Sequence, residues 1–146
     1  MIYFDSAYIA RCYLPEPGHA EVVALASRSP KIACAEIARI EVASVFHRKL
    51  REAAIPAAVH RELCLQFDED ISAGAWILLP LTKALIVRAQ TTYRTLPATL
   101  FLRSADCLHL CAAAEAGFKE IYSHDRHLLA AAPHFKLKGI DLTART

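Results

Sequence analysis

The sequence predicts an α/β fold: a three-layer α/β/α domain with a short, mainly parallel central sheet of four or five strands. Short apolar runs of strand length alternate along the chain with longer segments of helical periodicity. The apolar runs are nearly continuous, as in strands that are buried on both faces of a sheet. The chain has 146 residues, of which 55% are hydrophobic. With no internal repeat or linker, we expect a single domain over residues 1–146.

The N-terminal part of the chain follows this alternation. It predicts a strand at 2–4, a helix at 6–14 ended by Pro15, a helix at 18–29, a strand at 31–34 and a long helix at 35–54. On the long helix, Ile37, Glu41 and Val45 share one stripe, with Ile40 and Phe46 beside it. Glu41 is therefore expected to face inward.

The rest of the chain continues the pattern. It predicts a helix at 56–74, a strand at 76–79, a helix at 82–95, a connector at 97–102, a helix from Ser104 to Gly117, a strand at 120–123, a helix at 126–132 and an edge strand at either 135–137 or 140–142. Thr82 and Ser104 are expected to be N-caps, because their hydroxyls can accept a bond from a free backbone N–H. Trp76 is expected in the core, and the polar C-terminal end is expected to fray.

Composition bears on the partners and the cellular compartment expected for the protein. The net charge of +2 neither indicates nor excludes nucleic-acid binding. The five cysteines have no framework spacing, so we expect core residues in a reducing cytosol. The N-terminus predicts no signal peptide and no membrane span, and the expected location is the cytoplasm. The apolar excess predicts a further buried surface, such as a partner or a second copy.

Four acids are expected to converge at one edge of the sheet. Asp5 and Asp125 follow predicted strands, and parallel strands end at a common edge. Glu41 lies on an inward stripe, and Asp106 lies in the first turn of an apolar helix. Each acid alone has an ordinary explanation as a cap or a partner of the helix dipole. Together they repel one another, and oxygen ligands of this kind favour Mg²⁺ or Mn²⁺ over Zn²⁺.

Four runs of sequence carry a family resemblance. Residues 3–9, 35–41, 102–110 and 122–129 resemble the PIN-domain nucleases, and within them the VapC-type toxins of bacterial toxin–antitoxin pairs. The resemblance covers almost the whole chain, in order and at family spacing. His124 and His127 depart from it, because small or basic residues are commoner beside the last acid.

The resemblance implies a Mg²⁺-dependent endoribonuclease that hydrolyses RNA phosphodiester bonds. Its catalytic quartet would be Asp5, Glu41, Asp106 and Asp125, with Asp5, Asp106 and Asp125 holding the metal. Ser6 and Ser123 match small hydroxyl residues that order the metal and its water. The family also implies a homodimer held inactive by a cognate antitoxin protein.

Further residues keep two interpretations each. Arg103, Arg11 and Arg126 are candidates to bind RNA phosphates, although surface arginines are often only solvated. His109 either orients a carboxylate or is a hydrogen-bonded core histidine. Glu36 is a rival to Glu41, but its place at the helix N-terminus suits a dipole or cap role.

Two other functions are weighed against the nuclease. A phosphotransfer or phosphatase domain of the same class needs a second acid just after the first, where this chain has Ser6 and Ala7. A PIN-like binding module with an inactive site would not need four acids. The chain lacks a nucleophile elbow and a Gly-rich phosphate loop, which disfavours serine hydrolases and nucleotide-binding proteins.

Overall fold

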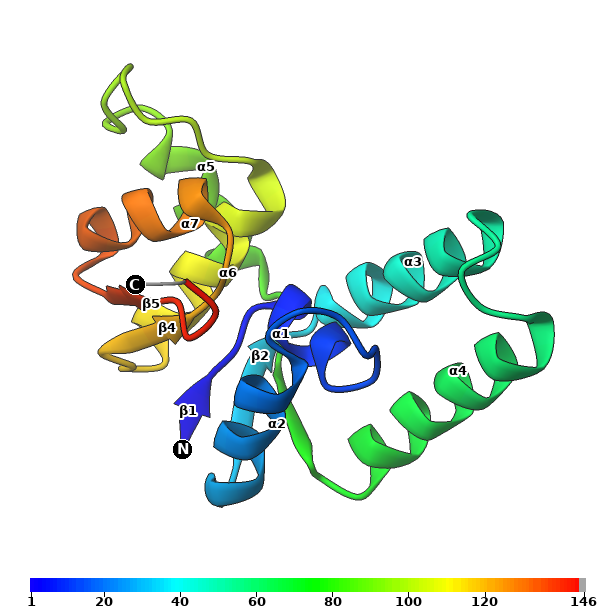
Figure 1. Ribbon diagram of the computed structural model, residues 1–146. Helices are drawn as coiled ribbons and strands as arrows, with labels where there is room; N and C mark the ends of the chain where they lie inside the picture. The colour runs from blue at the N-terminus through cyan, green and yellow to red at the C-terminus, as the bar shows by residue number, and fades with distance from the viewer. Residues whose placement is uncertain (145–146) are drawn as a thin grey trace.

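The computed structural model describes residues 1–144 (Figure 1). The elements in chain order are β1 (Ile2–Tyr3), α1 (Ser6–Arg11), α2 (His19–Arg28), β2 (Ile32–Ala35), α3 (Ala38–Arg51), α4 (Ala57–Ser72), β3 (Trp76–Leu79), α5 (Lys83–Thr92), α6 (Ser104–Glu115), β4 (Glu120–Tyr122), α7 (Arg126–Ala131), the 3-10 helix η1 (Ala132–Phe135) and β5 (Lys138–Ile140). The expectation of a frayed C-terminal end concerns in part residues 145–146, which lie outside the described range.

The strands form a parallel sheet in two parts. β1, β2 and β3 pair in that order, and β4 pairs with β5. A single parallel bridge between Phe4 and Tyr122 joins the two parts, so β1 and β4 lie side by side at the centre. The mainly parallel sheet predicted from the sequence is confirmed. All strands therefore end at one edge, where sites form in open parallel sheets.

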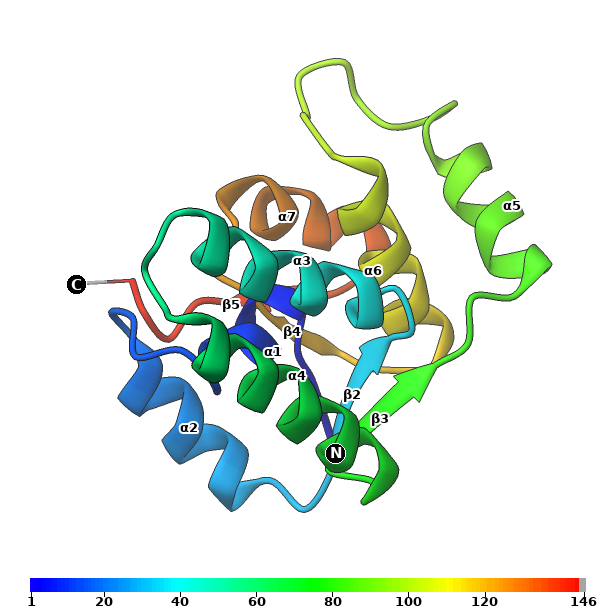
Figure 2. The ribbon, with the colours of Figure 1, turned by 90° about the vertical axis from the view of Figure 1, so that its right-hand side faces the viewer.

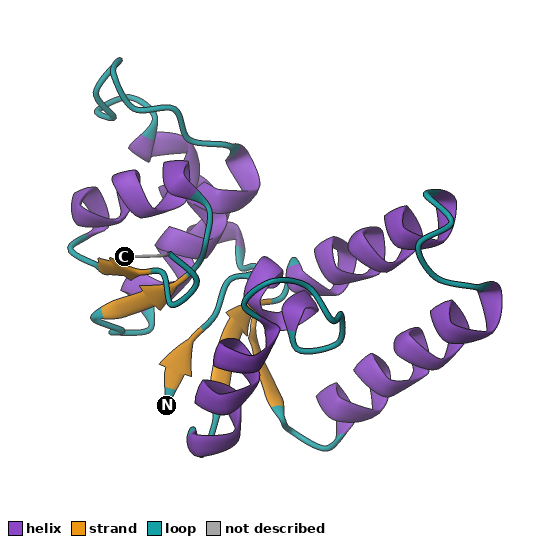
Figure 3. Ribbon diagram, viewed as in Figure 1, coloured by secondary structure: helices purple, strands orange, loops and turns teal. Residues whose placement is uncertain are grey.

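Helices cover both faces of this sheet, as Figure 3 shows with the strands in orange between the helices. Neighbouring residues of β1 and its extension pack into different cores: Tyr3 into the core with α5, α6 and α7, and Phe4 into the core with α1 to α4. In Figure 2, α3 and α4 lie together on one side of the strands. This period-2 alternation gives the predicted three-layer α/β/α architecture.

The stripe predicted on α3 is displaced. Its buried residues are Ala38, Val42 and Phe46, and the prediction that Ile40 lies beside the core is wrong, because Ile40 is 72% exposed. The stripe is set by packing of Phe46 against Phe67 of α4, at 6.3 Å between ring centroids. Glu41 is left at the border of this face, half-buried.

Several boundaries also differ from the prediction; α1, for example, ends at Arg11 and not at residue 14. Ser104 is not the N-cap of α6, because Arg103 is still extended (φ −76°, ψ 152°) and takes that position without a side-chain cap bond. The long helix begins later than predicted, because Ala35 pairs with Leu79 in the sheet. The edge strand is Lys138–Ile140, which overlaps the second predicted range only at Ile140, and Lys136 adopts a left-handed conformation (φ 59°) that ends η1.

Other predictions concern the core and the membrane. The N-cap at Thr82 is confirmed by its bond from Leu85 N, and Trp76 is buried. Of the five cysteines, Cys34, Cys107 and Cys111 are buried, whereas Cys12 and Cys64 are half-buried. Within residues 1–144, every helix is too short or too polar to cross a membrane.

The central position of β4 gives a first testable prediction. Ile121 is fully buried, so Ile121→Ala should lower the free energy of unfolding by about 2–5 kcal/mol through lost burial and a cavity. Ile86→Ala is the matched control, because Ile86 is 51% exposed and its loss should change stability by less than about 0.5 kcal/mol. Urea denaturation of both variants measures the difference; equal effects would place β4 outside the core.

Candidate active site

The four predicted acids line one cavity at the carboxyl edge of the sheet. The cavity has a volume of about 270 Å³, and Asp5, Glu41, Asp106 and Asp125 all contribute to its wall. They come from four places in the chain: the end of β1, the first turn of α3, the first turn of α6 and the turn after β4. Ser6, Arg11, Arg103, His109 and His124 line the same cavity.

Asp5 is held by the sheet and by α1. Its backbone N–H donates to the Tyr122 carbonyl at 3.1 Å, which continues the contact between β1 and β4. Its side chain caps α1 by accepting from Tyr8 N at 2.8 Å, and it also accepts from the Ser123 hydroxyl. The side chain is buried, and this burial raises the pKa of Asp5 above its usual value.

Ser123 connects two of the acids. Its hydroxyl donates to Asp5 and accepts from the backbone N–H of Asp125 at 2.9 Å. Asp125 in turn caps α7, accepting from His127 N and Leu128 N through Oδ1. Burial opposes its ionisation, but these two N–H groups and the charge of Arg103 hold the pKa of Asp125 below its usual value. Its other oxygen, Oδ2, faces the cavity and Arg103.

Asp106 lies in the first turn of α6 and is buried. Arg103 Nε donates to its Oδ2 at 2.8 Å, and Arg103 Nη2 donates to Asp125 Oδ2 at 2.6 Å. One guanidinium therefore joins the two carboxylates across two elements. The sequence placed Arg103 beside the helix but gave no indication of this bridge, because Asp125 lies 22 residues away.

Two side chains, Ser6 and His109, contact the same carboxylate oxygen of Glu41. The Ser6 hydroxyl donates to its Oε1 at 2.8 Å, and His109 Nε2 lies 2.7 Å from the same oxygen. Burial opposes ionisation of Glu41, but His109 and Ser6 outweigh it and lower the pKa of the carboxyl. With 31% of its side chain exposed, Glu41 remains open to the cavity. Its rival Glu36 is half-buried and pairs with Arg39 at 3.5 Å, and it does not line the cavity.

His109 fits both interpretations given to it, because it is a core residue that also orients a carboxylate. It is 1% exposed, and its Nδ1 lies 3.0 Å from the Tyr3 hydroxyl. That hydroxyl accepts from Ala35 N at 2.9 Å, so β1, β2 and α6 all fix the ring. Burial lowers the pKa of His109, but Tyr3, Cys34 and Glu41 outweigh it and raise the pKa well above 6.5. The sequence did not indicate that Tyr3 contacts His109, because Tyr3 lies in an apolar strand.

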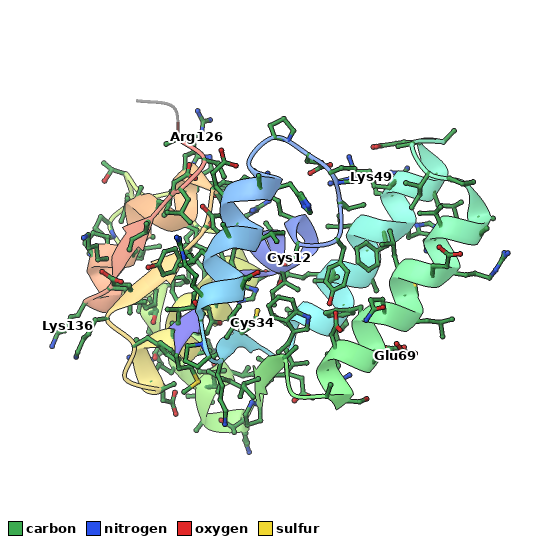
Figure 4. The ribbon with its side chains drawn as sticks, turned by 60° about the horizontal axis from the view of Figure 1, so that its bottom comes forward. Cys12, Cys34, Lys49, Glu69, Arg126 and Lys136 are labelled. Carbon is green, nitrogen blue, oxygen red and sulfur yellow. The ribbon has the colours of Figure 1, made fainter. Side chains whose placement is uncertain are left out.

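The three candidate RNA-binding arginines are placed differently. Arg103 lines the cavity, as does Arg11, whose Nη1 donates to the Pro17 carbonyl at 2.6 Å. Arg126 is exposed at the edge of the molecule in Figure 4, where its Nε contacts His127 at 3.4 Å, and it is not part of the cavity wall. Of the departures from the family pattern, His124 lines the cavity and stacks on Tyr8.

The donor chemistry of the cavity suits a hard divalent cation. Carboxylates and the Ser6 hydroxyl converge here beside arginines of the cavity wall, and such oxygen ligands suit Mg²⁺ or Mn²⁺. As arranged, however, residues 1–144 contain no set of three or more His, Cys, Asp or Glu side chains placed to hold one ion together. Each of the four acids instead lies within hydrogen-bond distance of a polar group of the protein itself.

These pKa shifts predict how stability depends on pH in metal-free protein. The raised pKa of His109 stabilises the fold fully below pH 6.5, and this contribution is lost as pH rises through the folded-state value. The lowered pKa of Glu41 stabilises the fold above pH 4.5. The raised pKa of Asp5 makes its ionisation costly as pH rises. Melting temperature should therefore be highest at mildly acidic pH and fall toward pH 9.

His109→Gln is the informative variant for this profile. Glutamine keeps a hydrogen-bond donor for Glu41 but does not titrate. The fall in melting temperature at alkaline pH should therefore become shallower, while the melting temperature is lower at every pH. Scanning calorimetry from pH 4 to pH 9 with a chelator present measures both curves. A wild-type melting temperature that climbs steadily toward pH 9 would contradict the assignment.

Solved structures share the fold at low sequence identity. VapC20 of Mycobacterium tuberculosis, described as a Sarcin-Ricin loop cleaving toxin, aligns with a TM-score of 0.70 and 16% identity over 90% of this chain and 95% of its own. A chain of FitAcB from Neisseria gonorrhoeae aligns with a TM-score of 0.66 and 16% sequence identity over 96% of each chain. A chain of FitAB bound to the IR36 DNA fragment aligns with a TM-score of 0.68 and 15% sequence identity over 100% of this chain and 98% of its own.

Identities this low show a common fold only. A comparison with curated proteins found no significant match. The family model of the PIN domain, in contrast, matches residues 2–133, a range that contains β1 to α7 and all four acids of the cavity. This chain therefore belongs to the PIN domain family.

Proposed function

We propose that the protein is a Mg²⁺-dependent endoribonuclease and the toxin of a type II toxin–antitoxin pair. One observation carries the proposal: four carboxylates from four separate elements of a PIN domain line a single cavity. A cluster of like charges is costly in a partly buried site unless cations bind there. Its position at the carboxyl edge of a parallel sheet leaves it open to a substrate.

Each residue of the cavity has a separate role in phosphodiester hydrolysis. Asp5, Asp106 and Asp125 would hold the metal, with Mn²⁺ as an alternative to Mg²⁺. The ion, when bound, supplies charge neutralisation at the phosphate and activation of a water nucleophile. Glu41 orients the water, because His109 and Ser6 fix its Oε1 while its exposed side reaches the cavity. Ser123 keeps Asp5 and Asp125 at a fixed spacing through its two hydrogen bonds.

Substrate and partner follow from the cavity and from the structural neighbours. Arg11 and Arg103 line the cavity and can contact phosphate oxygens, whereas Arg126 could act only from the outer edge. VapC20 is described as cleaving the Sarcin-Ricin loop, which supports RNA as the substrate class. The FitAB complex on DNA supports a cognate antitoxin as partner. A homodimer in the cytoplasm completes the proposal.

Asp106→Asn tests the site directly. The substitution removes one charge from the cavity while keeping the size of the side chain, so RNA cleavage should fall by at least about a hundredfold with the fold retained. Cleavage of a labelled total-RNA substrate and growth inhibition on expression measure activity, and circular dichroism checks the fold. Asp68→Asn on exposed α4 is the matched control and should retain wild-type activity. Full activity of Asp106→Asn would refute the assignment.

Removal of divalent cations tests the chemistry. Cleavage should stop in excess chelator and return when Mg²⁺ or Mn²⁺ is added, because the four acids alone neither neutralise the phosphate nor activate water. Restoring Ca²⁺ alone should support substrate binding but little cleavage. Cleavage that continues at the same rate in chelator would overturn the metal-dependent mechanism.

A further inference from the structure

Arg103 occupies an unusual place among the cavity residues. It belongs to the turn before α6, and its guanidinium uses Nε for Asp106 Oδ2 (2.8 Å) and Nη2 for Asp125 Oδ2 (2.6 Å). The two carboxylates are poorly accessible, with 9% and 23% of their side chains exposed, whereas the side chain of Arg103 is 57% exposed. A solvent-exposed cation thus bridges two less accessible anions.

The other two acids are satisfied by different groups. Glu41 accepts from Ser6 and is paired with buried His109. Asp5 accepts from Ser123 and from the backbone of α1. Arg103 is therefore the cation assigned to Asp106 and Asp125 among the residues that the structure describes, and both of its contacts use the carboxylate oxygens that face the cavity.

We infer that Arg103 is a positioning residue that exchanges with the divalent cation: it holds Asp106 and Asp125 in the metal-free protein and leaves them when the ion binds. The inference rests on the proposed function, because it concerns the same acidic site. Arg103 occupies Oδ2 of both carboxylates, so a divalent cation that binds these oxygens competes with the guanidinium.

Exchange needs little structural change. The Arg103 side chain can rotate into solvent without moving the backbone, because it is more than half exposed and its backbone already lies outside α6. A dication and a guanidinium within the cavity repel each other, which favours departure of the arginine. Asp106 and Asp125 stay in place, since one is fixed within α6 and the other caps α7. The ion thus meets two ligands that are already positioned.

The inference predicts opposite effects on metal affinity and on metal-free stability. Arg103→Gln should bind Mn²⁺ about threefold to tenfold more tightly than wild type, because two partly exposed ion pairs no longer compete. The same variant should melt about 2–4 °C lower in chelator, because two carboxylates lose their counter-cation. Titration calorimetry with Mn²⁺ alone and scanning calorimetry of the full chain measure the two quantities.

Two further variants sharpen the test. Arg103→Lys should fall between wild type and Arg103→Gln, because one ammonium is a point charge that cannot bridge both acids as the planar guanidinium does. Arg61→Gln on α4 makes the same change in net charge far from the cavity, and it should leave Mn²⁺ affinity unchanged. An arginine with a purely structural role would lower the melting temperature without tightening Mn²⁺ binding.

The possible failures are distinguishable. If wild type binds Mn²⁺ and cleaves RNA while Arg103→Gln binds Mn²⁺ equally or more weakly, the exchange is refuted and the nuclease assignment stands. If wild type neither binds Mn²⁺ nor cleaves RNA, the proposed function fails and the exchange fails with it. Tighter Mn²⁺ binding by Arg103→Gln, together with an unchanged Arg61→Gln control, supports the exchange.

Discussion

Electrostatic repulsion among carboxylates at the edge of the sheet is the constraint on which the rest of this structure depends. Parallel strands bring their carboxyl ends together, and here that edge receives Asp5, Glu41, Asp106 and Asp125. The protein relieves the repulsion in three ways. Asp5 is buried with a raised pKa, Glu41 is paired with His109, and the remaining two acids share one arginine.

The sheet is built to support this edge. Its two parts are joined at a seam, the bridge between Phe4 and Tyr122, in which Asp5 N donates to the Tyr122 carbonyl. The seam thus ends at the acids, and Ser123 continues it by linking Asp5 to Asp125. Tyr3 of β1, whose hydroxyl accepts from Ala35 N of β2, contacts the ring of His109, which is paired with Glu41. The same packed strands therefore form the core and orient the acids.

Much of this could be predicted from the sequence for identifiable reasons. Asp5 directly follows a predicted strand and Asp125 lies two residues past another, and both were identified because strand ends in a parallel sheet share an edge. Helix periodicity placed Glu41 on the inner half of α3 but misplaced Ile40, since a stripe of period 3.6 does not say which residues meet α4. The N-cap assigned to Ser104 was wrong, because the extended backbone at Arg103 places that residue at the N-cap and Ser104 inside the helix.

By itself, the sequence determined the α/β class, the parallel sheet and the acids at its edge, because hydrophobic periodicity and strand ends are local properties of the chain. Only the tertiary structure decided the partners of those acids. The bond from Tyr3 to His109 spans 106 residues, and the bridge from Arg103 to Asp125 spans 22. Such pairs depend on the distances between packed elements, which no local pattern encodes. The charge state and accessibility of the site are for this reason properties of the folded chain.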